Sequence, residues 1–277
     1  MNYRKATPAD REAYCRLWQQ VFGDAPAFSG VVFDDFAGVD NIYVAEEDGA
    51  LAAILSAVPV TLQDRRGAYY YGLATDPAAR GKGVMTGLMQ AADGDLKARG
   101  VQFTCLVPAS ESLFGFYEQR GYQKAFPLRR LTRSIKRCLW SHAELDSVTA
   151  RQLAKLREKY APNSVQHTDT GWIDVLRDLY SGGLTIVSAE DGYGLYFRHG
   201  DTLEFIELFA EGDRAAERLL EAARDKTGAE EAVITVGEQQ NLFLGEGKRL
   251  DYGMIHFLGQ PFDVHDSYMR LMMDNEG

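Results

Sequence analysis

The two halves of the sequence repeat one order of features, and this repetition constrains the fold more than any other property of the chain. Each half has an Asp-Gly turn between two β-rich runs, at Gly49 and at Gly192, and this dipeptide readily adopts a tight hairpin turn. A further β-rich run, a helical run, a glycine suited to end that helix (Gly100 and Gly228) and a short strand follow in both halves. We therefore expect two copies of one α/β fold, although unrelated α/β units built from similar parts would give a similar pattern.

The repeat places one domain over residues 1–135 and a second over residues 136–277. A helix is expected to begin at residues 7–10, where Thr-Pro-Ala-Asp supplies a capping hydroxyl, a proline and an acid. The other elements expected in the first domain are strands within 41–62, 68–75 and 101–107 and helices over 84–99 and 112–120. A last strand should close each sheet, from Tyr122 onwards in the first domain and over 252–258 in the second.

Composition limits the classes of function. With 45% hydrophobic residues, the 277-residue chain can bury a core, so disorder is excluded. The net charge of -10 disfavours a nucleic-acid partner, because phosphate backbones require clustered Lys and Arg. Cys15, Cys105 and Cys138 lack metal-site spacing and predict free thiols and no metal. No signal peptide and no apolar run of membrane-spanning length is evident, which predicts a cytoplasmic protein with no membrane partner.

The two copies differ most at the turn before their central helix. Residues 76–83 read DPAARGKG, whereas the second copy has only the acidic Glu211-Gly212-Asp213. Unpaired amides and the helix dipole make a helix N-terminus a ready anion site, and glycines let an anion approach closely. Arg80 and Lys82 add positive charge, so the first turn favours a diphosphate.

Three other interpretations of this turn compete with a diphosphate site. Gly81-x-Gly83-x-x-x-Gly87 resembles a loose dinucleotide fingerprint, but residues 76–80 separate it from its strand and the expected acid at the next strand end is missing. The sequence of this turn does not match the P-loop pattern G-x-x-x-x-G-K-S/T. A basic, solvated turn without a ligand stays open as the plain alternative.

The same region resembles the GCN5-related N-acetyltransferases (GNAT). Arg80 and Gly83 match the Q/R-x-x-G-x-G/A coenzyme A loop of that family, whereas Met85 departs from it as in a two-domain branch, the enhanced-intracellular-survival acetyltransferases. Residues 116–122, FYEQRGY, resemble the family's F-Y-x-x-x-G-F/Y segment. The resemblance covers about residues 1 to 130 and is only fold-like beyond them. It implies a GNAT fold with a mixed, mainly antiparallel sheet flanked by helices, followed by a degenerate GNAT-like domain that shapes the acceptor site.

The resemblance also implies where acetyl-CoA binds. Its pantetheine would pair with the strand end at Leu73, Ala74 and Thr75, between two strands that splay apart. Gly72 is a candidate for a β-bulge that opens this edge. The diphosphate would take the turn amides, and the residues expected to bind the cosubstrate there are Arg80, Gly81, Lys82, Gly83, Val84 and Met85.

Acetyl transfer in this family proceeds by direct attack of an amine on the thioester. The resemblance makes Tyr117 the proton donor to the departing thiolate, although an aromatic core residue is the alternative. Ser112 and Ser110 could hydrogen-bond the thiolate or the pantetheine, or could cap a helix. Tyr69, Tyr70 and Tyr71 could line an acceptor pocket or simply pack in the sheet.

No general base is identified from the sequence. The acidic candidates are Glu46, Glu111, Glu204 and Glu207, the five histidines are scattered, and the chain ends in the polar Asp274-Asn275-Glu276-Gly277. The expected function is therefore an acetyl-CoA-dependent N-acetyltransferase acting on a primary amine. A non-catalytic coenzyme A-binding regulatory module is the alternative. The acceptor's identity stays open, and a homo-oligomer is compatible with the sequence.

Overall fold

The computed structural model describes residues 1–137, 143 and 147–270, and it divides them between two compact units. Unit 1 comprises residues 1–123, 166–174 and 254–262, and unit 2 comprises residues 124–165, 175–253 and 263 onwards. Cys138, His142 and the chain end at 274–277 lie outside the described residues. Cys15 and Cys105 are buried free thiols.

Unit 1 is built on a mostly antiparallel sheet of eight strands in the order β1-β2-β3-β4-β5-β14-β6, with β8 added beside β3. Its strands are β1 (Asn2–Lys5), β2 (Ile42–Glu47), β3 (Ala50–Leu62), β4 (Arg65–Thr75), β5 (Phe103–Leu106), β6 (Gln123–Ala125), β8 (Gln166–His167) and β14 (Gly253–Phe257). β2 and β3 form the hairpin predicted around Gly49. β4 and β5 pair in parallel in the middle of the sheet.

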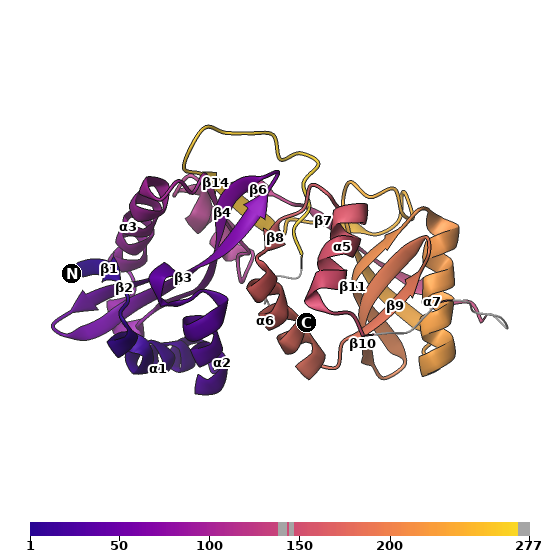
Figure 1. Ribbon diagram of the computed structural model, residues 1–277, viewed down its shortest axis with the longest axis horizontal. Coiled ribbons are helices and arrows are strands. Elements are labelled where there is room, and N and C mark those ends of the chain that lie inside the picture. Colours follow the sequence, from indigo (N-terminus) through magenta and orange to yellow (C-terminus); the bar gives the residue numbers. More distant parts are fainter. Residues whose placement is uncertain (138–142, 144–146, 271–277) are drawn as a thin grey trace. The chain divides into compact units, whose positions relative to one another are not determined.

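Helices cover both faces of this sheet (Figure 1). α1 (Arg11–Phe22) and α2 (Pro26–Val31) lie on one face, where Tyr14 Oη is 2.7 Å from Ser56 Oγ of β3. α3 (Val84–Ala98) and α4 (Ser112–Glu118) pack on the other face. The buried apolar side chains of both helices form one core cluster with Leu55 of β3. The start predicted at residues 7–10 is confirmed, with a 3-10 turn at Pro8–Asp10 before the α-helix begins. α4 ends at Glu118, before the predicted end at residue 120, and β5 is shorter than the strand predicted over 101–107.

Unit 2 contains a second mixed sheet, in the order β13-β7-β12-β11-β10-β9. Its strands are β7 (Leu128–Ser134), β9 (Thr185–Ala189), β10 (Gly192–His199), β11 (Thr202–Ala210), β12 (Glu231–Gly237) and β13 (Lys248–Leu250). α7 (Asp213–Thr227) packs its alanine- and leucine-rich face against this sheet, and α5 (Ala150–Tyr160) and α6 (Asp169–Ser181) precede the first hairpin. The hairpin at Gly192, the parallel β11 and β12 and the helix between them confirm the predicted repeat.

The strands that close the two sheets are exchanged, which corrects the prediction for residues 252–258. β14 does not complete the second sheet but pairs antiparallel with β5 of the first, with Ile255 opposite Cys105. β7, which follows the first copy, pairs instead with β12, with Ile234 opposite Leu131. β7 (LRRLTRS) is rich in arginine and buries only Leu128 and Leu131, whereas the first three residues of β14 (GMIHF) are buried. The sequence of neither strand specifies which sheet it joins, because strand partners far apart in the chain are not encoded by local pattern. Unit 1 therefore includes residues from the far end of the chain, in contrast to the expected division at residue 135.

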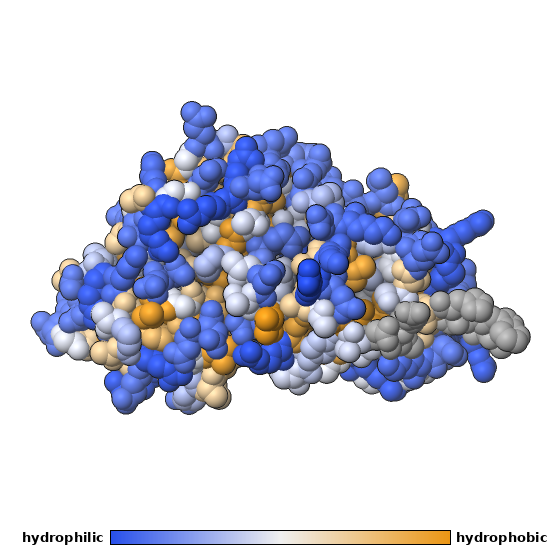
Figure 2. All heavy atoms as spheres, viewed as in Figure 1, coloured by the Kyte–Doolittle hydropathy of each residue, from blue (hydrophilic) through white to orange (hydrophobic). Residues whose placement is uncertain are grey.

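Hydrophilic residues cover most of the surface visible in Figure 2, and hydrophobic ones are scattered among them. The exposed large hydrophobic residues are Met1, Phe22, Ile173, Leu244 and Leu250. Within the described ranges, every helix is too short or too polar to cross a membrane. The cytoplasmic location stays a prediction.

A fully buried ion pair lies inside unit 2. Arg157 Nη1 of α5 donates to Glu207 Oε2 of β11 at 2.5 Å, and both side chains have no exposed surface. Glu207 also accepts hydrogen bonds from the hydroxyls of Tyr193 at 2.6 Å and Tyr268 at 3.1 Å. Burial of Tyr193 and Tyr268 raises the pKa of both side chains, and the nearby Glu207 charge raises it further, so their hydroxyls stay protonated donors. The carboxylate thus ties α5, β10, β11 and the segment after β14 to one another.

Replacing Arg157 by Met should lower the free energy of unfolding by about 3–5 kcal/mol, because the Glu207 carboxylate loses its buried counter-charge. Chemical denaturation monitored by circular dichroism measures the change. The double variant Arg157→Met/Glu207→Gln should recover part of the loss, and Arg151→Met, at an exposed position of α5, should have little effect. Equal losses for the single and double variants would contradict an electrostatic cause.

Candidate functional site

The connection from β4 to α3 makes two tight turns. Asp76 Oδ1 accepts the amide of Ala78 at 2.8 Å, which fixes a short 3-10 turn at Pro77–Ala79. The guanidinium of the next residue, Arg80, turns back, and its Nε donates to the carbonyl of Thr75 at 3.2 Å. The side chain of Arg80 is exposed and its positive charge lies beside the last residue of β4.

The bend that follows requires glycine at two positions. Gly81 and Gly83 have left-handed backbones, with φ of +74° and +75°. A Cβ at either position would meet no atom within 4 Å, so the conformation and not the available space favours glycine. Lys82 lies exposed between them. The bend is therefore open on its outer side and carries positive charge.

The first amides of α3 point into this bend. Gly83 is the N-cap of α3, and no side chain caps this end of the helix. The Gly83 carbonyl accepts a hydrogen bond from the amide of Gly87 at 3.0 Å. Among the described residues, the amides of Val84, Met85 and Thr86 have no hydrogen-bond partner. Unpaired amides at the N-terminus of a 15-residue helix form a concave donor site with the positive end of the helix dipole behind it. Such a site fits the oxygens of a phosphate.

β4 and β5 separate at the same end of the sheet. Their parallel pairing runs from Gly67 and Phe103 to Tyr69 and Cys105 and then stops, although β4 continues to Thr75. On the side that faces β5, the last residues of β4 have no partner strand in the described part of the chain. Leu73, Ala74 and Thr75, named from the sequence, lie on this free edge, which can pair with an extended amide-containing ligand.

A β-bulge on the opposite side of β4 accompanies this separation, as predicted at Gly72. Ile54 pairs with Ala74 and Ser56 with Tyr71, so two residues of β4 oppose one of β3. Gly72 has φ of +62°, and a Cβ there would lie 2.0 Å from Cζ3 of Trp18. Glycine at the bulge therefore lets the Trp18 indole of α1 pack directly on the backbone of β4.

Tyr117 of α4 is buried but its hydroxyl is unpaired. Its ring contacts those of Phe116 and Tyr122, with centroids 5.1 and 5.7 Å away. Among the described residues, no group forms a hydrogen bond with its Oη, and only 7% of the residue is exposed. Burial raises the pKa of Tyr117 to about 12, so the hydroxyl is protonated at neutral pH and able to donate. Both the donor role and the packing role named from the sequence fit this environment.

Arg120 joins the helix of Tyr117 to the helix that begins at the glycine bend. Its Nε and Nη2 donate to Thr86 Oγ1 at 3.0 and 2.5 Å, and its Nη1 donates to the carbonyl of Phe116 at 2.5 Å. The guanidinium also lies 3.4 Å from the centroid of the Phe116 ring. These contacts fix α4 against the first turn of α3. No local sequence signal indicates this role, since Arg120 only lies near the end of the predicted helix.

Ser110 and Ser112 lie at the start of α4 with their hydroxyls 2.9 Å apart. Both are exposed. The N-cap of α4 is Glu111, and no side chain caps this helix. The helix-capping alternative for the two serines is therefore wrong, and their hydroxyls are available to a ligand.

Tyr70, Asp93 and His256 form a polar cluster that the sequence did not reveal. Tyr70 Oη donates to Asp93 Oδ1 of α3 at 2.6 Å, and His256 Nε2 of β14 is 3.8 Å from Asp93 Oδ2. The other ring nitrogen of His256 is 3.0 Å from the carbonyl of Gly121, just after the Tyr117 helix. Burial raises the pKa of Asp93. Asp93 lies on the buried face of α3, but its histidine partner comes from the exchanged strand, so sequence spacing could not link them.

The acidic candidates named from the sequence are mostly occupied. Glu46 pairs with Arg4 at 2.7 Å, Glu204 with Arg130 at 2.9 Å, and Glu207 with Arg157. Glu111 is exposed at the start of α4. No grouping of three His, Cys, Asp or Glu side chains suitable for a metal occurs in the residues that the structure describes.

Tyr69 and Tyr71 lie on the face of the sheet opposite to α3. Tyr71 contacts Trp18 and Phe36, with ring centroids 5.6 and 5.9 Å away, and lies 5.7 Å from Tyr69. Tyr70 points to the other face, toward Asp93. Alternation along β4 therefore divides the three tyrosines, so they do not line one pocket together.

Residues 2–125 match the model of the acetyltransferase (GNAT) domain. Comparison with curated proteins gives no match. Three similar solved structures each cover 93% of this chain. A probable N-acyltransferase of unknown function from Enterococcus faecalis is 19% identical, with a TM-score of 0.72 over 72% of its own chain. A GCN5-related N-acetyltransferase from Anabaena variabilis (16%, TM-score 0.73, 73% of its chain) and Eis1 from Mycobacterium abscessus (16%, 0.70, 74%) are similar to the same extent. At these identities the likeness shows a shared fold.

Replacing Gly72 by Ala should destabilise the protein by about 2 kcal/mol or more, because the new methyl group collides with Trp18 and the backbone has positive φ. Thermal unfolding measures the effect. Gly94→Ala is the matched control, since a Cβ at this position of α3 meets no atom within 4 Å and alanine favours helix. A Gly72→Ala protein as stable as the Gly94→Ala protein would show that the bulge is adaptable.

Proposed function

Because residues 2–125 form a domain of the acetyltransferase (GNAT) family, we propose that this protein transfers the acetyl group of acetyl-CoA to a primary amine of a small molecule or peptide. The first unit is an acyltransferase domain, and acetyl-CoA is the cosubstrate of this family. One observation carries the proposal: the family match coincides with an open donor bend, a free strand edge and an unpaired tyrosine hydroxyl in one unit. The acceptor, the compartment and the role of residues 136–277 in acceptor binding stay predictions.

The cosubstrate would occupy the edge and the bend together. Its pantetheine amides would pair with the backbone of Leu73 to Thr75, and Arg80 would have to release the Thr75 carbonyl if the ligand uses it. Its diphosphate would accept the unpaired amides of Val84 and Met85, with the charges of Arg80 and Lys82 beside it. The hydroxyls of Ser110 and Ser112 would lie near the thioester end.

The chemistry would be direct acyl transfer. A neutral amine nitrogen attacks the thioester carbonyl carbon, and the tetrahedral intermediate collapses with cleavage of the carbon–sulfur bond. The amine proton leaves to solvent or a base, and Tyr117 gives its phenolic proton to the departing sulfur, forming the free thiol and the amide. Because the pKa of Tyr117 is about 12, its hydroxyl carries the proton at neutral pH.

Turnover across a panel of primary amines tests the function. The full-length protein is mixed with acetyl-CoA and each amine, and free thiol is followed with a chromogenic disulfide. An acetyltransferase releases thiol in proportion to an acetylated amine detected by mass spectrometry. Tight coenzyme A binding without amine-dependent release would instead support the regulatory module.

Tyr117→Phe should lower kcat by ten-fold or more, on the order of what general acid catalysis contributes, while the Kd for coenzyme A changes little. Because the pKa of Tyr117 is about 12, its ionisation should cause no fall in activity between neutral pH and about pH 10. Tyr122→Phe is the matched control, since the Tyr122 hydroxyl is already bonded to Thr104 at 2.7 Å. An unchanged kcat for Tyr117→Phe would remove this residue from the mechanism.

Gly83→Ala should weaken coenzyme A binding by about ten-fold, because a Cβ at positive φ costs about 1–2 kcal/mol and shifts the amides of the bend. Isothermal titration calorimetry gives the Kd. Gly94→Ala, in the same helix, should leave the Kd unchanged. If both variants bind coenzyme A like the unmodified protein, the bend is not the diphosphate site.

A further inference from the structure

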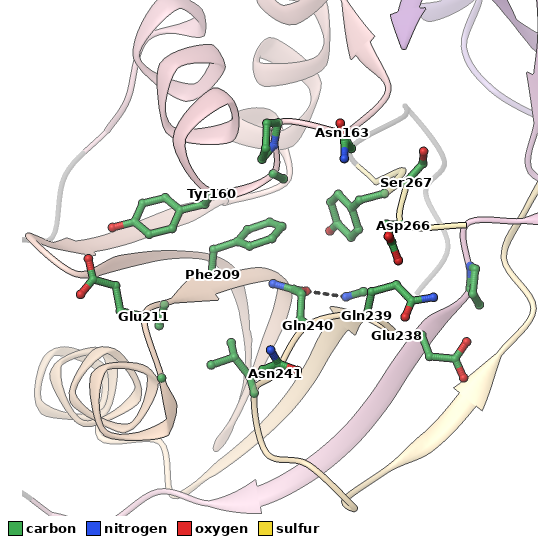
Figure 3. Close-up of a pocket in the computed structure, with 18 residues that line it drawn as sticks. Tyr160, Asn163, Phe209, Glu211, Glu238, Gln239, Gln240, Asn241, Asp266 and Ser267 are labelled. Atoms are coloured by element: carbon green, nitrogen blue, oxygen red, sulfur yellow. Dashed lines mark hydrogen bonds between the residues drawn. The ribbon is translucent and has the colours of Figure 1, made fainter. Parts of the chain in front are cut away.

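Unit 2 contains a hollow at the place that corresponds to the cofactor edge of unit 1. β11 and β12 pair in parallel from Thr202 and Glu231 to Phe205 and Ile234, and then both strands continue without pairing to each other. α7 is the next helix after β11, as α3 is the next α-helix after β4, although the turn before α7 is much shorter. Between the free strand ends lies a pocket of ≈ 440 Å³ (Figure 3). The repeat has therefore kept the opening between its two parallel strands.

This pocket has the opposite charge to the bend of unit 1. Glu211, Glu238 and Asp266 line it, and none of its described lining residues is a lysine or arginine. The turn before α7 has lost both cations, and Asp213 Oδ1 accepts the amide of Phe243 at 2.7 Å. A diphosphate would meet carboxylates where unit 1 offers amides and cations, so the pocket does not suit coenzyme A.

Two of the three carboxylates can still bind a cation. Glu238 is paired with Arg249 Nε at 2.8 Å. Glu211 is exposed and forms no ion pair in the described part of the chain, and Asp266 is bonded only to the ring of its neighbour His265 at 3.0 Å. In the view of Figure 3, Glu211 and Asp266 lie at opposite sides of the pocket.

Aromatic rings line the space between these two carboxylates. Phe209 and Tyr268 are buried, with centroids 5.3 Å apart, and Tyr160 contributes a third ring. The Tyr268 hydroxyl is held by Glu207, so its ring is fixed. The neighbouring Lys159 does not line the pocket. Its ammonium is held by the hydroxyl of Tyr160 at 2.9 Å and the carbonyl of Glu190 at 3.2 Å, and Glu211 attracts it without forming an ion pair with it in the described part of the chain. Aromatic faces stabilise both alkyl chains and cations.

We propose that this pocket is a second ligand site, one that binds a small aliphatic diamine or polyamine away from the acetyl-transfer centre. One ammonium group would pair with Glu211 and the other with Asp266, and the methylene chain would lie against Phe209 and Tyr268. The exposed side-chain amides of Asn163 and Asn241 could accept the remaining ammonium protons. No step of the proposed acetyl transfer uses these residues, so the inference stands apart from the proposed function.

Calorimetry with three probes of equal length tests the charge preference. Cadaverine, 1,5-pentanediol and glutarate are titrated into the full-length protein without acetyl-CoA. Cadaverine should bind, more weakly as NaCl is raised from about 50 to 300 mM, and the neutral and anionic probes should not. Pentanediol or glutarate binding as tightly as cadaverine would overturn the proposal.

Paired variants locate the site. Glu211→Gln/Asp266→Asn should weaken cadaverine binding by about ten-fold or more, because both counter-charges are lost. Glu221→Gln/Asp225→Asn changes the net charge equally on α7, outside the pocket lining, and should bind like the unmodified protein. Thiol release by the Glu211→Gln/Asp266→Asn protein should be unchanged at saturating amine, which separates this site from the transfer centre. Equal affinities for the two double variants would overturn the proposal even if the protein is an active acetyltransferase.

Discussion

The early end of the pairing between β4 and β5 is the constraint on which the rest of unit 1 depends. Two parallel strands that remained paired to their ends would satisfy each other's backbone groups and leave no edge for a ligand. Pairing stops at Tyr69 and Cys105, and the bulge at Gly72 with Trp18 packed on it holds β4 in its bent course. The donor bend, the free edge and the Tyr117 helix all lie beyond that point. Arg120 then holds the two helices together through Thr86.

The same skeleton serves two charge patterns in this chain. Unit 2 keeps the diverging parallel strands and the helix after the first of them, but its turn is acidic and has no left-handed Gly-x-Gly bend. The segment after β12 forms a loop where unit 1 has α4, and Arg129 of β7 donates to the loop carbonyls of Leu242 and Phe243. A fold can thus keep its opening while the residues around it determine which ligand is favoured.

The sequence predicts the local elements well because their signals are local. The Asp-Gly turns, the glycines of the bend and the start of the first helix each depend on a few adjacent residues, and all are found where expected. The Tyr117 segment and the glycine bend before α3 follow from short motifs, and their roles in binding and catalysis stay predictions. The partner of Asp93 could not be identified in this way, since His256 is far away in sequence and reaches unit 1 only through the topology. The pocket of unit 2 was also missed, because its lining comes from separate segments without a motif.

The exchange of β7 and β14 has a consequence for how the chain is made. A ribosome synthesises residues 1–135 first, yet β5 of that region reaches its native neighbour only when residues 253–257 have emerged. Until then the nascent first half has an open strand edge in the middle of its sheet, where a chaperone or another nascent chain could pair with it. Contacts of such long sequence separation also slow folding. The sheet of unit 1 is therefore complete only once residues 253–257 have been made.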